Sequence, residues 1–159
     1  MNDTNAVNEI ATRQPGWADA VRAHGGALLA EFAGTANTGG VAQLLGLGIP
    51  VTSLYNGDGY YGIPGNSTAL HVAAWKAWPE VVQLLIDRGA PIDATDGNGR
   101  TPLQLAIRAC VDSYWTNRRQ PASVRSLLQA GASLKNITIP CGYEEVDLLL
   151  RAAADARRQ

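Results

Sequence analysis

The chain has 159 residues, the size of one ordinary domain, and it can fold without a metal or a disulfide. Its charged fraction is 17% and its formal net charge is -1, so it lacks the basic excess with which nucleic-acid-binding domains neutralise phosphates. No apolar run is long enough to span a bilayer and the polar N-terminus lacks a signal-peptide pattern, so we expect a cytoplasmic protein with no nucleic-acid or membrane partner.

The first predicted elements are helical. In the N-terminal segment, residues 17–24 are predicted to form a capping helix, and residues 6–12 are a second candidate helix. Apolar residues then recur at helical spacing over 27–33 and 41–45, and the second of these stretches ends at glycines. The two stretches are predicted to form a first helix–turn–helix unit.

An insertion rich in glycine and tyrosine follows over residues 53–65. Its Asn-Gly and Asp-Gly pairs favour turns with positive φ, so the insertion is predicted to form an extended hairpin finger. Tyr60 and Tyr61 are unusual in a simple spacer. They either contact a binding partner or, together with Tyr55, pack against the base of the finger.

Two later stretches of the chain repeat each other. When residues 66–74 are aligned with 99–107, Thr68 falls on Thr101, a spacing of 33 residues. A threonine suits the N-cap of the helix that follows it, and each first helix precedes an apolar second helix that ends in Leu-Leu and then Gly-Ala. This pattern, with Asp, Gly, Thr-Pro-Leu and Ala at fixed positions, resembles the ankyrin-repeat family.

The resemblance implies an all-α ankyrin-repeat solenoid of about three helix-turn-helix repeats, with capping helices and the extended hairpin finger. The C-terminal helix is expected to lie where a fourth repeat would begin, and to act as a cap. The predicted units are residues 1–24 for the N-terminal segment and capping helix, 25–52, 66–95 and 96–135 for the repeats that together span 25–135, and 136–159 for the C-terminal capping helix.

A second insertion, over residues 110–120, interrupts the third repeat. The first helix of that repeat is predicted to continue to Tyr114 or Trp115, and the next helix to start near Pro121, because proline suits a first helical position. The two cysteines and two histidines do not have the spacing of a zinc site, so neither a metal nor a cofactor is expected.

Partners of ankyrin proteins dock on a concave face formed by hairpin tips and the exposed ends of first helices, so the resemblance implies a protein partner. Trp75 is expected to be exposed on this face, the alternative being that it covers a neighbouring helix or the first insertion; Trp78 is expected to pack. Asp112 is expected to pair with Arg108 or Arg119. The candidate partner-binding residues are Tyr60, Tyr61, Trp75, Lys76, Asn98, Arg100, Arg108, Asp112, Trp115 and Arg119.

An alternative function is the binding of a small molecule or a peptide in an aromatic pocket between the 53–65 finger and the 110–120 insertion. The sequence has no G-x-S-x-G elbow, phosphate loop or HExxH motif, so no catalytic residue is assigned and an unusual enzyme is the less expected reading. His71 matches the family's usual histidine, whose ring hydrogen-bonds to the backbone of the neighbouring loop, and is expected to be structural.

Overall fold

The structure is a computed structural model that describes residues 16–57, 62–112 and 119–158. The described residues are mostly helical, and each of the two strands is 2 residues long. The elements in chain order are α2 Trp17–Ala23, α3 Gly25–Gly34, α4 Thr38–Gly46, β1 Leu54–Tyr55, β2 Ser67–Thr68, α5 Ala69–Trp75, α6 Pro79–Asp87, α7 Pro102–Asp112, α8 Ala122–Gln129 and α9 Glu144–Ala156.

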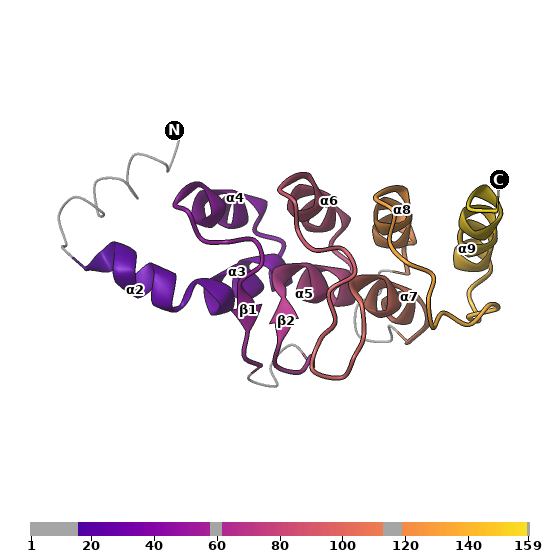
Figure 1. Ribbon diagram of the computed structural model, residues 1–159, viewed down its shortest axis with the longest axis horizontal. Helices are drawn as coiled ribbons and strands as arrows, with labels where there is room; N and C mark the ends of the chain where they lie inside the picture. Colours follow the sequence, from indigo (N-terminus) through magenta and orange to yellow (C-terminus); the bar gives the residue numbers. More distant parts are fainter. Residues whose placement is uncertain (1–15, 58–61, 113–118, 159) are drawn as a thin grey trace.

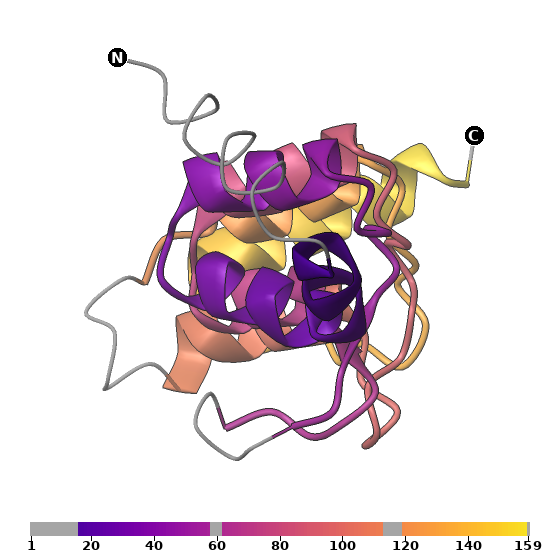
Figure 2. The same cartoon turned by 90° about the vertical axis from the view of Figure 1, so that its left-hand side faces the viewer.

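The helices stack in two rows (Figure 1). Helices α3, α5 and α7 form an inner row in which α5 packs against both of its neighbours, and α4, α6 and α8 form an outer row in which α6 does the same. Each inner helix also packs on the outer helix that follows it in the chain. Figure 2 looks along the stack and shows the rows as two layers, with connecting loops gathered along one edge. This is the all-α repeat architecture that the sequence predicts.

The ends of the helices follow the repeated residues. Thr68 is the N-cap of α5, and Thr68 and His71 satisfy each other's hydrogen-bonding groups in a capping box. In the next repeat, the Thr101 backbone donates to the Gln104 side chain at 2.9 Å, and the Gln104 backbone donates to the Thr101 hydroxyl at 3.3 Å. Gly89 follows α6 with a φ of 78°, which glycine adopts without steric cost.

The core is a continuous strip along the stack. Small side chains occupy the contacts between inner helices: Ala73, Ala74 and Ala106 are at most 1% exposed, which lets the helices approach closely. Trp78 packs between the first two helix pairs, as expected, and its Nε1 donates to the Gly34 carbonyl at 2.9 Å. Within the described ranges every helix is too short or too polar to cross a membrane.

The first insertion begins and ends as a short antiparallel ladder. Leu54 is paired with Thr68 and Tyr55 with Ser67, so β1 and β2 join the first two helix pairs. The Tyr55 side chain is 5% exposed, in agreement with the alternative that it packs against the base of the finger. Residues 58–61 lie outside the described part of the chain, so the finger beyond its base stays a prediction.

The C-terminal helix does not lie where its position in the sequence suggests. Counted from the preceding repeat, α9 occupies the place of a first helix, which would put it beside α7. Instead α9 packs against α8, and Figure 1 shows it level with the outer row. The connector over residues 134–143 carries the chain past α7 before α9 begins. Helix α9 therefore does not take the first-helix position of a fourth repeat, and its predicted role as a C-terminal cap stays a prediction.

The second insertion is described only at its two ends. Helix α7 is described as far as Asp112, and the stretch predicted to extend it, including Tyr114 and Trp115, lies outside the described residues. The following helix starts at Ala122, and Pro121 is its N-cap. Proline usually takes the first helical position, so this helix starts one residue later than that preference suggests.

Candidate functional site

The Trp75 side chain is buried, contrary to the main expectation for it. It is 8% exposed because the first insertion folds back over the inner row. A Cβ atom added to Gly62 would stand 3.6 Å from Nε1 of the indole, an ordinary van der Waals contact. Trp75 therefore covers the first insertion, which is the alternative considered from the sequence, and it cannot offer a partner an open ring face at this place.

Arg108 is an exposed residue of helix α7 in the inner row. Its guanidinium carbon lies 5.5 Å from the centroid of the Trp75 ring, and its Nε lies 3.0 Å from a carboxylate oxygen of Asp112. The predicted pairing of Asp112 with Arg108 is thus confirmed. Both side chains remain about half exposed, 52% and 47% respectively, so the ion pair is held on one side and open on the other.

The hairpin tip between the second and third repeats is organised by a buried carboxylate. The side chain of Asp96 is 0% exposed. It accepts hydrogen bonds from the backbone N–H groups of Asn98 and Arg100, both at 2.9 Å, and its other oxygen pairs with Nε of Arg100 at 3.0 Å. As a result Asn98 is exposed and Arg100 half-buried at fixed positions. An Asp followed by Gly-Asn-Gly is the signal in the sequence for this turn.

The remaining candidates are not gathered into one site. Lys76 ends α5 and is half-buried, and burial lowers the pKa of its ammonium group. Arg119 is exposed, and its backbone carbonyl accepts a hydrogen bond of 2.9 Å from the Tyr143 hydroxyl. Tyr60, Tyr61 and Trp115 lie outside the described residues, so their roles stay predictions.

His71 has the structural role expected of it. The imidazole is 0% exposed, and its Nδ1 accepts from the Thr68 backbone N–H at 3.1 Å. Its Nε2 therefore carries the proton and donates to the carbonyls of Ala94 and Arg100, at 3.0 and 3.1 Å. Burial lowers the pKa of the ring, outweighing the opposing effect of the Arg100 carbonyl. The neutral ring thus joins the second repeat to the hairpin of the third through its hydrogen bonds.

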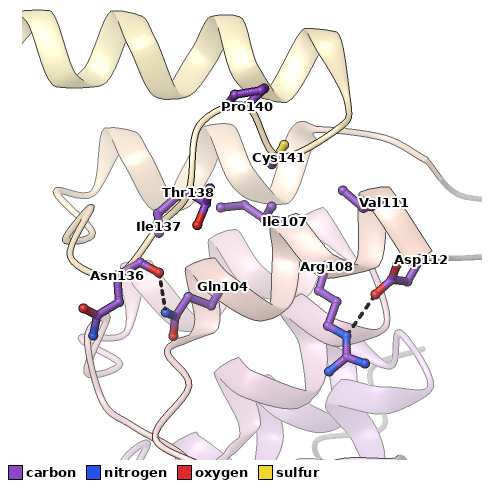
Figure 3. A pocket seen from close by; sticks show the side chains of 10 residues that line it. All are labelled: Gln104, Ile107, Arg108, Val111, Asp112, Asn136, Ile137, Thr138, Pro140 and Cys141. Carbon is purple, nitrogen blue, oxygen red and sulfur yellow. Dashed lines mark hydrogen bonds and ion pairs between the residues drawn. The ribbon is translucent and has the colours of Figure 1, made fainter.

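A cleft of about 410 Å³ lies on the flank of α7 that faces the connector (Figure 3). Its floor is apolar, with Ile107 and Val111 from the helix and Ile137 from the connector. Two polar pairs border it: the Gln104 side chain bonded to the Asn136 carbonyl at 3.3 Å, and Arg108 with Asp112. The full lining is Gln104, Ile107, Arg108, Val111, Asp112, Asn136, Ile137, Thr138, Pro140 and Cys141.

This cleft differs from the aromatic pocket that the sequence suggested. Among the described residues, none of the finger lines the cleft, and of the predicted site residues only Arg108 and Asp112 take part. Sequence reasoning missed the others because half of the cleft comes from the connector. The helix half does have a signal, since Gln104, Ile107 and Val111 are spaced as one face of a helix. A pocket between the two insertions would include residues outside the described ranges and stays a prediction.

The stacked helix pairs, the capping boxes and the hairpin loops at one edge define a helical repeat protein. Residues 57–106 match the family model described as "Ankyrin repeats (many copies)". Together with the relatives below, this match shows that the chain contains ankyrin repeats.

Curated relatives resemble about half of the chain or less. A "Putative ankyrin repeat protein" of Rickettsia bellii is 40% identical over 79 residues, which are 50% of this chain and 29% of the relative. The "Serine/threonine-protein kinase 12" of Arabidopsis thaliana is 37% identical over 83 residues, 52% of this chain and 16% of that protein. Human Rabankyrin-5 is 42% identical over 52 residues, 33% of this chain and 4% of its own length. The matched region thus spans less than a third of each relative.

Proposed function

We propose that the protein is a protein-interaction module, and that its partner rests on the open part of the inner face. This part runs from the hairpin tip at Asn98 and Arg100 to the exposed pair of Arg108 and Asp112. Ankyrin repeats generally mediate protein–protein interaction, which supports the class of function. The loop with Gly62, which lies beside Trp75, favours a surface on the third helix pair rather than on the second.

The observation that carries the proposal is the fixed yet exposed Arg108. Its guanidinium is held from below by the Trp75 ring and from the side by Asp112, while half of the side chain faces solvent. Arginine is enriched among the interface residues that dominate binding energy. A side chain already held in one place loses little conformational entropy when a partner docks, so more of the contact energy appears as affinity.

The hairpin tip adds a second fixed group to the same surface. The Asp96 carboxylate bonds the backbone on both sides of Gly99, which fixes the loop that presents Asn98. An exposed amide can both donate and accept hydrogen bonds. The proposed surface is therefore polar, preorganised and suited to a partner with complementary polar groups around a small contact area.

The test is affinity purification with quantitative mass spectrometry, using wild type, an Asn98→Arg/Arg108→Ala variant and a Gln83→Arg/Arg125→Ala variant. The last makes the same kinds of change on the exposed sides of α6 and α8, in the outer row. A partner captured by wild type and by the outer-row variant, and lost at least tenfold by the inner-face variant, supports the proposal.

The captured protein is then purified and titrated against the same three chains. Equal affinity for the inner-face variant and wild type would place the interaction elsewhere on the molecule. Capture of no protein above background by wild type would count against the interaction function itself. Circular dichroism melts of all three chains establish that a lost interaction is not a lost fold.

A further inference from the structure

The flank of α7 that borders the cleft corresponds to a flank that is covered in the preceding repeat. With the 33-residue spacing, Gln104, Ile107 and Arg108 are equivalent to His71, Ala74 and Trp75. On α5 these three positions are buried, with exposures of 0%, 0% and 8%: α7 packs on α5, and the loop with Gly62 also covers Trp75. On α7, Ile107 is buried as well, at 8% exposure, whereas Gln104 is half-buried and Arg108 is exposed. This side of α7 is thus more open at Gln104 and Arg108 than the equivalent side of α5.

No inner helix within the described residues follows α7. Helix α9, which could have continued the row, packs on α8 instead and is hydrogen-bonded to the loop after α8 and to the connector. The Arg157 side chain bonds the Ala132 carbonyl, and the Asp147 carboxylate accepts from the Cys141 backbone N–H, both at 2.6 Å. Among the described residues, the connector alone crosses this side of α7, and it leaves the cleft of about 410 Å³ between itself and the helix.

We propose that this cleft binds an amphipathic helix of a partner protein, placed so that it continues the inner row of α3, α5 and α7. The interface it would extend already exists twice within the stack, between α3 and α5 and between α5 and α7. The cleft is within the usual ligand-pocket range of roughly 300–1,000 Å³, so it admits an apolar ridge of side chains rather than a whole helix. The cleft shares Arg108 and Asp112 with the surface proposed above but excludes the hairpin tip, and its binding of a helix does not rest on the proposed function.

The residues that line the cleft determine which side chains the docking helix needs. Ile107, Val111 and Ile137 call for aliphatic or aromatic side chains at two positions one turn apart. At the border, Nε of Arg108 donates to Asp112, and the terminal amino groups of Arg108 can donate to a further acceptor. A carboxylate on the docking helix can take both amino groups in a bidentate pair. The partner is thus an amphipathic helix with an apolar ridge and an acidic residue beside it.

The experiment uses a phage library of helical peptides about 18 residues long, randomised on one face at the spacing i, i+3, i+4 and i+7. The library is first depleted on a Thr138→Arg variant, which places a long side chain at the exposed edge of the cleft, and then selected on wild type. The matched control is Thr52→Arg, an exposed threonine in the turn after α4. Both substitutions lie in exposed loops, and their melting temperatures are checked against wild type.

Enriched peptides are expected to carry apolar residues at two randomised positions and Asp or Glu at a third. Their affinity should fall at least tenfold with Thr138→Arg and with Val111→Asp, and stay unchanged with Thr52→Arg and Asn98→Arg. Amide shifts of the labelled protein should be confined to residues 104–111 and 136–141. Absence of enrichment, enriched peptides without an acidic residue, or equal binding to Thr138→Arg would each overturn the proposal. Because Asn98→Arg alters only the hairpin tip and Thr138→Arg only the cleft, measuring both partners against both variants tells failure of one proposal from failure of the other.

Discussion

His71 and Gln104 perform the same task with different side chains, and exchanging one for the other tests how the repeats are joined. His71 accepts from the Thr68 backbone and donates to carbonyls of the next hairpin. Gln104 accepts from the Thr101 backbone with Oε1 and donates to the Asn136 carbonyl with Nε2. A His71→Gln substitution should therefore keep both kinds of bond, whereas His71→Ala removes them.

The expected costs follow from burial. The imidazole is fully buried, so His71→Ala leaves the Thr68 N–H without its acceptor, which costs about 1–3 kcal/mol, and opens a cavity as well. We expect a total loss of about 3 kcal/mol, or a fall in melting temperature of about 6–12 °C for a domain of this size. His71→Gln should lose about 1 kcal/mol or less, because both bonds can be rebuilt.

Wild type and His71→Gln should also differ in how their free energy of unfolding depends on pH. Burial lowers the pKa of folded His71 below 6.5, so the unfolded chain binds a proton at a higher pH than the folded chain does. Stability from this group is therefore present above pH 6.5 and is lost as the pH falls through the window below it. At pH 5.5 the loss is at most about 1.4 kcal/mol, since one pKa unit corresponds to 1.36 kcal/mol.

The assay is thermal and urea unfolding of wild type, His71→Gln and His71→Ala at pH 7.5 and 5.5. The comparison of wild type with His71→Gln cancels the titration of groups that both chains share. Wild type should lose more stability than His71→Gln on acidification. A glutamine variant as unstable as the alanine variant would refute the role of the ring's hydrogen bonds in joining the repeats. A glutamine variant with the same pH dependence as wild type would refute the lowered pKa of buried His71.

Three further outcomes are expected. Trp75→Ala should lower the free energy of unfolding by about 3–5 kcal/mol, as for a buried aromatic residue; an unchanged melting temperature would contradict its burial. Gly26→Ala should destabilise by about 1–3 kcal/mol because its Cβ would run into the Leu54 carbonyl, whereas Gly39→Ala should stabilise by about 0.5 kcal/mol, since the nearest atom to its Cβ is 3.7 Å away. Iodoacetamide at pH 8 should modify the half-buried Cys141 well before Cys110, because burial raises the pKa of the Cys110 thiol to about 11; equal rates by peptide mass spectrometry would contradict this.

The repeated part of the fold could be predicted because its contacts are local and periodic. Thr68, His71 and Gly89 each act within one repeat or on the next, so the residue type and its place in the period specify the interaction. The first helix pair could be recognised for the same reason, because the 19 residues from Leu29 to Gly48 equal the spacing from Leu70 to Gly89. Neighbour contacts of this kind need no knowledge of the whole chain.

The insertions and the connector could not be predicted in this way. Trp75 is at a position that would be open in a regular stack, and its burial depends on where the loop with Gly62 folds back. The cleft beside Ile107 depends on α9 packing against α8. In this position the Arg157 side chain also bonds the Ala132 carbonyl in the loop after α8. Neither outcome has a periodic signal, because each arises from a segment that occurs once.

The hydrogen bond from Trp78 to Gly34 has a consequence for how the molecule opens. Its two residues are 44 positions apart, and they join the first helix pair to the second. In the first pair, α3 has no side-chain cap at His24 and both helices contain glycines, so this unit would fray early if it stood alone. The bond and the β1–β2 ladder tie its opening to that of its neighbour. Amide hydrogens of α3 and α5 should therefore exchange through one shared cooperative unit, with closely similar opening free energies.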